Sequence, residues 1–478
     1  MTSTTSSDQK LSLAALIAMV IGSMVGAGIF TLPSKFGSAS GVLGALIAWG
    51  IAGTGMLMLA FVFQTLSRRR PDLDAGIYAY AKAGFGNYLG FTSALGYWIT
   101  CCLAQLACLI LIKATLGTFF PFFGDGSTPA AVLSASVLVW GVHLLVLRGI
   151  KQAAALNTIA TVAKIVPLFV FIVVAVAAFR TDSFASNFWG GQGYELGSVA
   201  AQTRGIMLVT VFVFVGIEGA SVYSRYARRR ADVGLATVLG FLAVLSLLVL
   251  VTMLSYGILP RAELSTLRTP SVAGVMEAIV GPWGKAFISV SLLISVLGNY
   301  LSWALLAAEV LYSASRDDTM PSFLAGENHN RVPVAALWLS NSVIQVFLVV
   351  TSFAEQSFSL ALKMTSSMTL IPYLLVAGYG LQLAWTGATY DAEPRGRSGD
   401  LVRSAIAVVY AAGMIYAGGL TFLLLSALIY APGSVLYFLA RREQKETVFT
   451  STERLVFGLV VVAALAGVYG IVSGSLAV

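Results

Sequence analysis

Residues 13–33 read LAALIAMVIGSMVGAGIFTLP, an apolar stretch that is long enough to cross a lipid bilayer. Its middle contains Gly22, Gly26 and Gly28, and each glycine costs about 1 kcal/mol relative to alanine inside a helix. In hydrocarbon, an interrupted backbone is tolerated only where protein or a water-filled cavity satisfies the freed polar groups. The stretch therefore predicts a membrane span that is broken at mid-depth, with a binding site at the break.

The composition of the whole chain is that of a polytopic membrane protein. Of its 478 residues, 58% are hydrophobic and only 10% are charged, and the mean hydropathy is +0.87. Residues 1–11 are polar and form an expected cytoplasmic tail, and the apolar run behind them is too long for the core of a signal peptide. We expect a retained first span and one membrane domain with no soluble domain attached.

Windows of about 20 apolar residues predict about thirteen transmembrane helices. The predicted spans are 12–34, 41–66, 86–118, 130–148, 155–178, 203–224, 234–258, 284–312, 334–353, 360–384, 402–419, 421–440 and 455–476. Most arginines and lysines fall on one side of these spans, and the positive-inside rule makes that side, with the N-terminus, cytoplasmic. An odd number of spans then predicts an extracytoplasmic C-terminus. Because topology accounts for the net charge of +8, no nucleic-acid partner is expected.

The residue pattern does not support a metal site or an enzyme. Cys101, Cys102 and Cys108 fall in one apolar run, and the two histidines, His143 and His329, lie far apart in the chain. No nucleophile–base set and no phosphate-binding loop is recognisable, so neither catalysis nor a cofactor is expected. A membrane-bound amino acid sensor would be expected to carry a signalling domain, and none is visible.

A second apolar span, predicted at 203–224, is interrupted in a similar way. Its residues 214–224 read FVGIEGASVYS, so that Gly216 and Gly219 bracket Glu218 at membrane depth. Interrupted spans in corresponding positions of two halves indicate the binding site of a secondary transporter. Because half-helix ends offer a positive and a negative pole, such a site suits the carboxylate and the ammonium of a free amino acid.

Three stretches are long and specific enough to identify a family. They are GAGIFTLP at 26–33, FVGIEGASVYS at 214–224 and LSWALLAAEVLYSASRDDTMP at 301–321. They resemble the amino acid–polyamine–organocation superfamily, and within it the basic amino acid/polyamine antiporters. The sequence along nearly the whole chain is similar to those of bacterial arginine/ornithine antiporters.

This resemblance implies an all-α, LeuT-like fold with a five-plus-five inverted repeat, in which helices 1 and 6 are discontinuous. The implied divisions are a tail at 1–11, repeats at 12–200 and 201–385, and accessory helices 11–13 at 386–478.

The resemblance also implies which residues hold the substrate. Backbone amides of residues 26–28, at the positive end of a half-helix, would meet the carboxylate. Carbonyls near Met24, Phe212 and Val215 would meet the ammonium. The full set of implied substrate-binding residues is Met24, Gly26, Ala27, Gly28, Tyr97, Gln105, Cys108, Phe212, Val215 and Trp303.

Several of these residues depart from the family pattern. Tyr97, Phe212 and Trp303 would close over the ligand, but relatives usually carry tryptophan where this chain has Phe212. Gln105 stands where relatives tend to carry asparagine. Resizing a pocket by one methylene changes discrimination between substrates by about 1–3 kcal/mol. We therefore assign selectivity to Gln105, Cys108, Phe212 and Trp303.

Two ionisable residues within spans complete the implied machinery. Glu218 matches a glutamate that couples substrate state to gating in arginine/agmatine relatives, and it could exchange a proton as substrate comes and goes. Lys164 stands where sodium-coupled relatives hold a cation, so its ammonium would lie near the carbonyls around Gly22 and Ser23 and make sodium unnecessary.

These features predict a secondary active antiporter that exchanges arginine for ornithine or another cationic amino acid or amine by alternating access. The alternative is a proton-coupled transporter or exchanger of a histidine-like, aromatic or neutral amino acid, which the altered pocket residues favour. The expected partners are amino acid substrates and the lipid bilayer, with a homodimer left open. The expected location is the bacterial cytoplasmic (inner) membrane.

Overall fold

Helices make up nearly all of the structure, a computed structural model. It describes residues 12–73, 76–149, 153–190, 196–218, 230–354, 356–391 and 394–476. Within these ranges no β-strand forms, and an isolated β-bridge joins Glu327 to Pro333. The expected tail at 1–11 and the part of the second interruption after Glu218 lie outside the described residues. The all-helical prediction is confirmed, as expected for a bilayer, where a helix satisfies its own backbone polar groups.

The helices follow the predicted spans in order. The first span forms α1 (Leu13–Met24), η2 (Ala27–Thr31) and α2 (Leu32–Ala39). The first half continues with α3 (Val42–Arg69), α4 (Ile77–Phe85), α5 (Asn87–Phe119), η3 (Pro121–Phe123), α6 (Pro129–Leu147), α7 (Ala153–Ala177) and α8 (Thr181–Ser186). The second half contains α9 (Leu196–Phe212), α11 (Arg230–Tyr256), α12 (Arg261–Thr266), α13 (Ser271–Val280), α14 (Pro282–Arg316), η5 (Ser322–Ala325), α15 (Val334–Thr351), α16 (Ser357–Thr386), α17 (Arg397–Glu443) and α18 (Ser451–Val472).

Local end signals in the sequence explain several of these boundaries. The Thr128 side chain caps the first turn of α6 by accepting a hydrogen bond from the Ala131 amide. Thr450 and Glu453 form a reciprocal capping box at the start of α18. Gly387, whose φ is +78°, ends α16 in the left-handed conformation that glycine adopts without strain.

The number of helices that could cross a membrane differs from the predicted thirteen. In the described residues, nine helices are long and apolar enough, or ten if Leu16–Met24 and Ala27–Ala39 count as one broken span. Part of the difference comes from α17, whose 47 residues include a break at Gly419 (φ 80°, ψ 170°). A straight helix of that length would measure about 70 Å, more than twice the hydrocarbon thickness. The break at Gly419 lies at the junction of the predicted spans 402–419 and 421–440, so α17 corresponds to two predicted spans.

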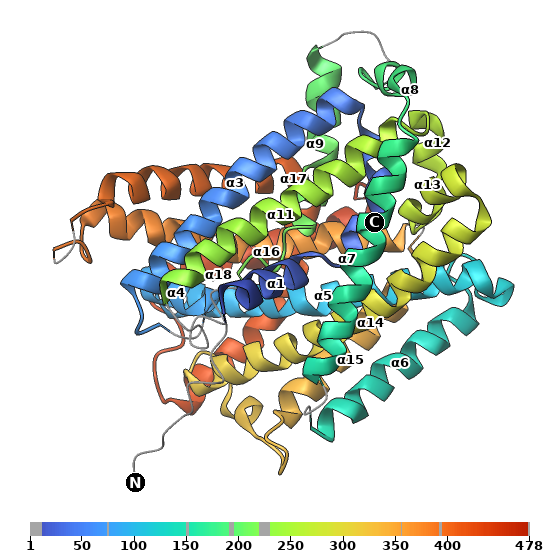
Figure 1. The fold of residues 1–478 in the computed structure, drawn as a ribbon. Helices are drawn as coiled ribbons and strands as arrows, with labels where there is room; N and C mark the ends of the chain where they lie inside the picture. Colours follow the sequence, from blue (N-terminus) through green and yellow to red (C-terminus); the bar gives the residue numbers. More distant parts are fainter. Residues whose placement is uncertain are drawn as a thin grey trace.

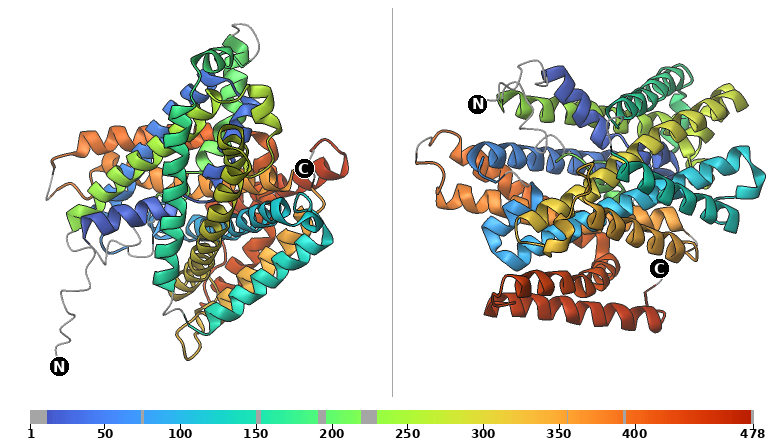
Figure 2. Two further views of the ribbon diagram at one scale, coloured as in Figure 1. Left: turned by 45° about the vertical axis from the view of Figure 1, so that its right-hand side comes forward. Right: turned by 90° about the horizontal axis from the view of Figure 1, so that it is seen from below.

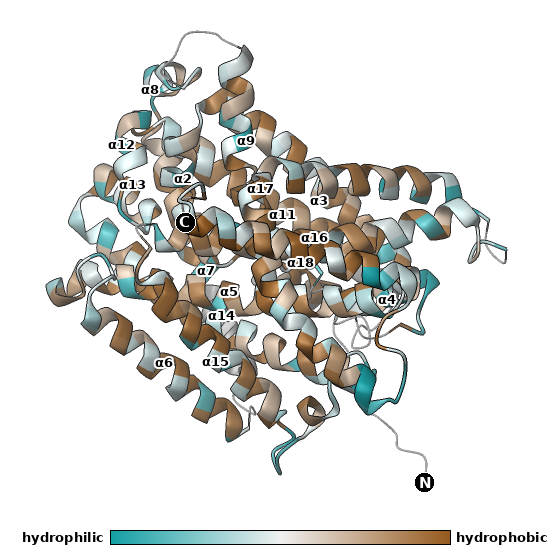
Figure 3. Cartoon of the chain, turned by 180° about the vertical axis from the view of Figure 1, so that it is seen from behind, coloured by the Kyte–Doolittle hydropathy of each residue, from teal (hydrophilic) through white to brown (hydrophobic). Residues whose placement is uncertain are grey.

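Helix α5 lies at the centre of the protein, and its apolar window is completely buried (Figure 1). The last two helical segments form an outer layer, since the second half of α17 and α18 lie side by side (Figure 2). This layer packs against the start of α5, where the Tyr437 and Tyr88 rings meet edge to face with their centres 5.2 Å apart. Apolar residues cover the outer faces of the peripheral helices, and polar residues gather at the helix ends and in the connections (Figure 3). This distribution is that of a multi-pass membrane protein.

A buried ion cluster joins α17 to α3. Arg69 Nε lies 3.7 Å from Asp400 Oδ2, and both side chains are only 4% exposed. The hydroxyls of Thr65 and Tyr390 donate to the two carboxylate oxygens of Asp400 at 3.2 and 3.0 Å. The Arg69 guanidinium also lies 3.5 Å from the centre of the Tyr390 ring. Helix α17 is thus attached to α3 by charge as well as by packing.

Replacing Asp400 by asparagine should destabilise the protein by about 3 kcal/mol, because the buried Arg69 charge loses its counterion. We expect a lower midpoint of thermal unfolding for the purified Asp400→Asn variant in detergent. Asp72→Asn is the control, because Asp72 pairs with Arg70 on the surface with 58% of its side chain exposed, and such pairs contribute little. Equal midpoints for both variants would contradict a stabilising role of the cluster.

Candidate functional site

The first span is broken where the glycines predicted it. Helix α1 ends at Met24, Gly26 is extended (φ −119°, ψ −154°), and the chain re-enters a helix at Ala27. The two parts, Leu16–Met24 and Ala27–Ala39, are bent by 44°. The first amides of a helix have no partner within it, so the start of η2 presents free N–H groups at the break.

The second interrupted span breaks directly beside the first. Helix α9 ends at Phe212, and the next turns close tightly, with the Phe214 amide donating to the Val211 carbonyl at 3.0 Å. Gly216 has a φ of +107°, a conformation that favours glycine. A side chain there would come within 2.7 Å of the Ser23 carbonyl oxygen, so the two breaks pack backbone to backbone. The Ser23 hydroxyl donates to the Gly216 carbonyl at 3.0 Å and joins them directly.

Two other glycines permit this close approach. An added Cβ at Gly28 would lie 2.7 Å from Val213 Cγ1 and 2.9 Å from Phe212 Cδ1. An added Cβ at Gly26 would lie 3.0 Å from the side-chain nitrogen of Asn299 on α14. Both glycines therefore serve helix packing as well as exposing backbone amides.

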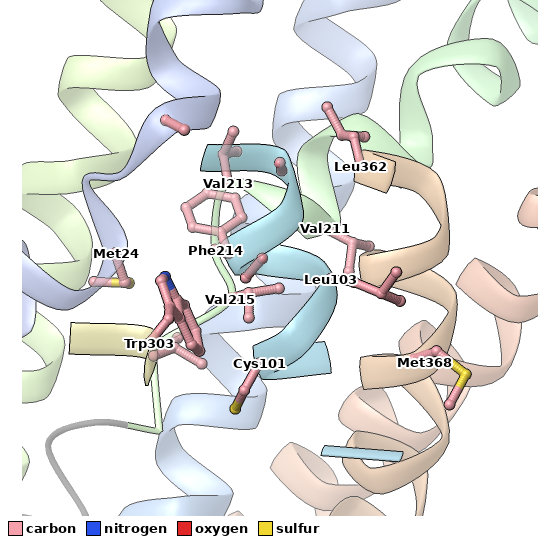
Figure 4. Packing of buried hydrophobic residues seen from close by; sticks show 14 of the residues in the cluster. Met24, Cys101, Leu103, Val211, Val213, Phe214, Val215, Trp303, Leu362 and Met368 are labelled. Atoms are coloured by element: carbon pink, nitrogen blue, oxygen red, sulfur yellow. The ribbon is translucent and has the colours of Figure 1, made fainter. Parts of the chain in front are cut away.

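A small cavity of about 30 Å³ lies between the two breaks. Its walls come from α1, η2, α5, α9, α14 and α16, and its lining residues are Ser23, Met24, Gly26, Ala27, Gly28, Ile29, Ala104, Cys108, Phe212, Val213, Val215, Asn299, Trp303 and Thr365. Figure 4 shows Met24, Val215 and Trp303 converging from three different elements. Pockets that hold small-molecule ligands measure about 300–1,000 Å³, so the lining must move before such a ligand can enter.

Most of the predicted site residues line this cavity. They are Met24, Gly26, Ala27, Gly28, Cys108, Phe212, Val215 and Trp303. The structure places Gln105 and Tyr97 elsewhere. Ala104 and Cys108, one helical turn apart on α5, line the cavity, whereas Gln105, to one side of them on the helix, does not. The Gln105 amide donates to the Cys101 carbonyl of its own helix at 3.2 Å, and its buried side-chain oxygen accepts no hydrogen bond from the residues that the structure describes.

Tyr97 instead belongs to a polar contact centred on Glu218. The hydroxyls of Tyr97 on α5 and Tyr373 on α16 each donate to one Glu218 carboxylate oxygen at 2.5 Å. The Gly216 amide donates to the same carboxylate at 3.2 Å. Glu218 is only 1% exposed, so a single acid ties the broken span to two other helices. Adding or removing its proton would change these ties.

Lys164 on α7 makes the other polar contact with a break. Its Nζ donates to the Gly22 carbonyl oxygen at 2.9 Å, and the side chain is 1% exposed. The ammonium thus meets the last turn of α1, where unpaired carbonyls form the negative end of the helix. Its location is the one implied by the family resemblance.

Sequence reasoning missed Asn299 and Tyr373. The Asn299 amide donates to Cys108 Sγ at 3.6 Å, a weak acceptor, and it lines the cavity one turn before Trp303. The hydroxyls of Ser23 and Thr365, which also line the cavity, already donate to backbone carbonyls. A lone amide in an apolar span was the signal that could have identified Asn299. Tyr373 carried no comparable signal.

Comparisons with known proteins agree on one family. A sequence model described as amino acid permease matches residues 11–462. An arginine/ornithine antiporter of Pseudomonas aeruginosa is 53% identical over 98% of this chain and 99% of its own length. An L-lysine transport protein of Corynebacterium glutamicum is 43% identical, over 98% of this chain and 96% of its own. An arginine/agmatine antiporter of Chlamydia pneumoniae is 36% identical, over 98% and 97%.

The close packing around Gly28 predicts that a larger residue at this position destabilises the protein. Gly28→Ala should lower the thermal unfolding midpoint, because overpacking of this kind costs about 1–3 kcal/mol. Gly50→Ala on α3 is the matched control, since an added Cβ there meets nothing within 4 Å. Scanning fluorimetry of both purified variants checks this, and identical midpoints would show that the site tolerates a side chain at Gly28.

Proposed function

Because the chain belongs to the amino acid permease family, we propose that it is a secondary antiporter that exchanges arginine for ornithine by alternating access. The observation that carries the proposal is the meeting of two broken spans around one cavity, with Glu218 and Lys164 at the two breaks. The names of the relatives support the substrate class, since three of them are named for arginine or lysine.

In the proposed mechanism, the start of η2 holds the part that all amino acids share. Its free amides would bind the carboxylate, and the carbonyls of Met24 and Phe212 would accept from the ammonium. The substrate side chain would then lie toward Cys108 and Trp303, which line the cavity from α5 and α14. Asn299, beside Gly26, could donate to the carboxylate in place of its weak bond to sulfur.

Glu218 is the proposed link between substrate and gating. Its bonds from Tyr97 and Tyr373 hold α5 and α16 to the broken span, so they must be released or rearranged before that side of the site opens. A cationic substrate nearby would stabilise the charged carboxylate, and its departure would favour protonation. Substrate binding and opening would thereby be coupled.

Lys164 is the proposed substitute for a coupling cation. Its ammonium already satisfies the Gly22 carbonyl, so the end of α1 needs no metal ion to balance it. A carrier with fixed charges at both breaks would reorient poorly without substrate, which accounts for exchange rather than net uptake.

One feature of the cavity favours the alternative function. Among the described lining residues there is no acidic side chain, so a cationic group would be held by ring faces, carbonyls and sulfur. A neutral, aromatic or histidine-like amino acid with an uncharged side chain would need no partner for a positive charge in the cavity. A proton-coupled transporter or exchanger of such an amino acid is therefore the second candidate.

We assign the two inverted repeats to residues 12–200 and 201–385, and the accessory helices to 386–478. By the positive-inside rule the N-terminus is cytoplasmic and the C-terminus extracytoplasmic, in the bacterial inner membrane. The homodimer stays a prediction.

Transport by purified protein in liposomes tests the exchange. Liposomes loaded with ornithine should accumulate labelled arginine, and unloaded liposomes should take up no more than protein-free ones. Uptake undiminished without internal substrate would exclude strict exchange. In a competition panel, lysine, ornithine and agmatine should inhibit, whereas inhibition by neutral amino acids alone would replace this proposal by the alternative.

Glu218→Gln should slow exchange and make the remaining rate independent of pH. A neutral amide cannot gain or lose a proton as substrate binds, so substrate could no longer act through it on the hydrogen bonds from Tyr97 and Tyr373. Glu309→Gln is the control, since Glu309 is an exposed acid on α14 that accepts a local hydrogen bond from Ser313 at 3.2 Å. An arginine-induced thermal shift shows whether the variant still binds substrate. An unchanged pH profile of Glu218→Gln would remove the proposed role.

A further inference from the structure

An open groove of about 560 Å³ lies far from the central cavity, at the end of α6. It is lined by Leu144, Leu147 and Arg148 from α6 and its end, by residues 328–330 of the connection between α14 and α15, and by Val334. Helices α6 and α15 lie side by side at the edge of the protein (Figure 1). Because α6 ends at Leu147 and α15 begins at Val334, the groove lies where these two apolar helices give way to a polar connection.

The polar wall of the groove is a rigid loop fastened to the helix end. The side-chain amides of Asn328 and Asn330 both donate to the Leu147 carbonyl, at 2.9 and 3.1 Å. The Asn328 side-chain oxygen accepts from the backbone amides of Asn330 and Val332 at 2.9 and 3.1 Å. These bonds satisfy the Leu147 carbonyl at the end of α6, which would otherwise repel an anion beside Arg148.

An arginine and a histidine face the groove. Arg148 and His329 are exposed, and neither makes an ion pair within the described part of the chain. Glu327, the acid nearest in sequence to the lining residues, hydrogen-bonds with Tyr312, and Asp317 at the start of the connection pairs with Lys82. An arginine fork without a carboxylate partner matches a phosphate geometrically.

The other wall of the groove is apolar and faces outward. Leu144 is 57% exposed, and its neighbour Leu145 and Trp338 of α15 are each 48% exposed. In a membrane-spanning helix, such side chains contact acyl chains. The groove therefore joins a cationic end at the membrane boundary to an apolar face that runs into the bilayer.

We propose that this groove binds an anionic phospholipid of the surrounding bilayer. Its phosphate lies at Arg148 and His329, and its acyl chains lie along Leu144 toward Trp338. Basic pockets at the ends of transmembrane helices recognise lipid headgroups in this way. The bound lipid bridges α6 to the α14–α15 connection and stabilises that junction.

The test titrates purified full-length protein in a neutral detergent with phosphatidylglycerol and follows the thermal unfolding midpoint. Phosphatidylglycerol should raise the midpoint more than phosphatidylcholine, which has the same chains but no net charge. Arg148→Gln should raise the lipid concentration needed for half of the shift by about tenfold or more, as expected for the loss of a charged hydrogen bond. Arg148→Lys should retain part of the effect, because it keeps the charge but loses the fork.

Arg442→Gln is the matched control for loss of one positive charge. Arg442 is exposed on the same predicted side, where it lies 4.3 Å from the centre of the Phe438 ring, and it is remote from the groove in sequence. This variant should respond to phosphatidylglycerol as the wild type does. An equal loss in both glutamine variants, an equal shift with phosphatidylcholine, or the same shift with inorganic phosphate alone would each overturn the proposal.

Discussion

Hydrocarbon cannot hydrogen-bond an interrupted helix, and this constraint governs how the centre of the protein is arranged. Each broken span has polar backbone groups to satisfy, and each lies where the other can help. Ser23 donates across to Gly216, and Gly216 presses against the Ser23 carbonyl in a backbone conformation suited to glycine. A single broken span would have required a different partner at the same depth.

The buried charges continue the same logic. Lys164 meets the carbonyl end of α1, and Glu218 receives an amide of its own broken segment together with two phenolic hydroxyls. Charges that stabilise the breaks are thus also the charges that a substrate would disturb. Stability and proposed function use the same few side chains, so a substitution at either one should be read through both effects.

The sequence predicts where a helix or a break lies along the chain far better than which way a side chain points around its helix. Glycines in an apolar run located both breaks, and hydropathy located the helices, because these signals depend on local composition. Tyr97 and Gln105 were expected at the cavity, but their placement depends on helix rotation and on which neighbour packs against α5. Tyr373 became visible only when α16 was placed against the second break. Contacts between distant spans have no local signature.

The three cysteines of the chain have a practical consequence. Cys101, Cys102 and Cys108 all lie on α5 and are at most 1% exposed, and the sequence contains no others. A water-soluble thiol reagent should therefore label none of the three cysteines while the cavity is closed. Cys108 is the one of these thiols that lines the cavity, and a water-soluble reagent can reach it only when water enters the cavity. Labelling of Cys108 in the native chain would therefore report when the cavity opens.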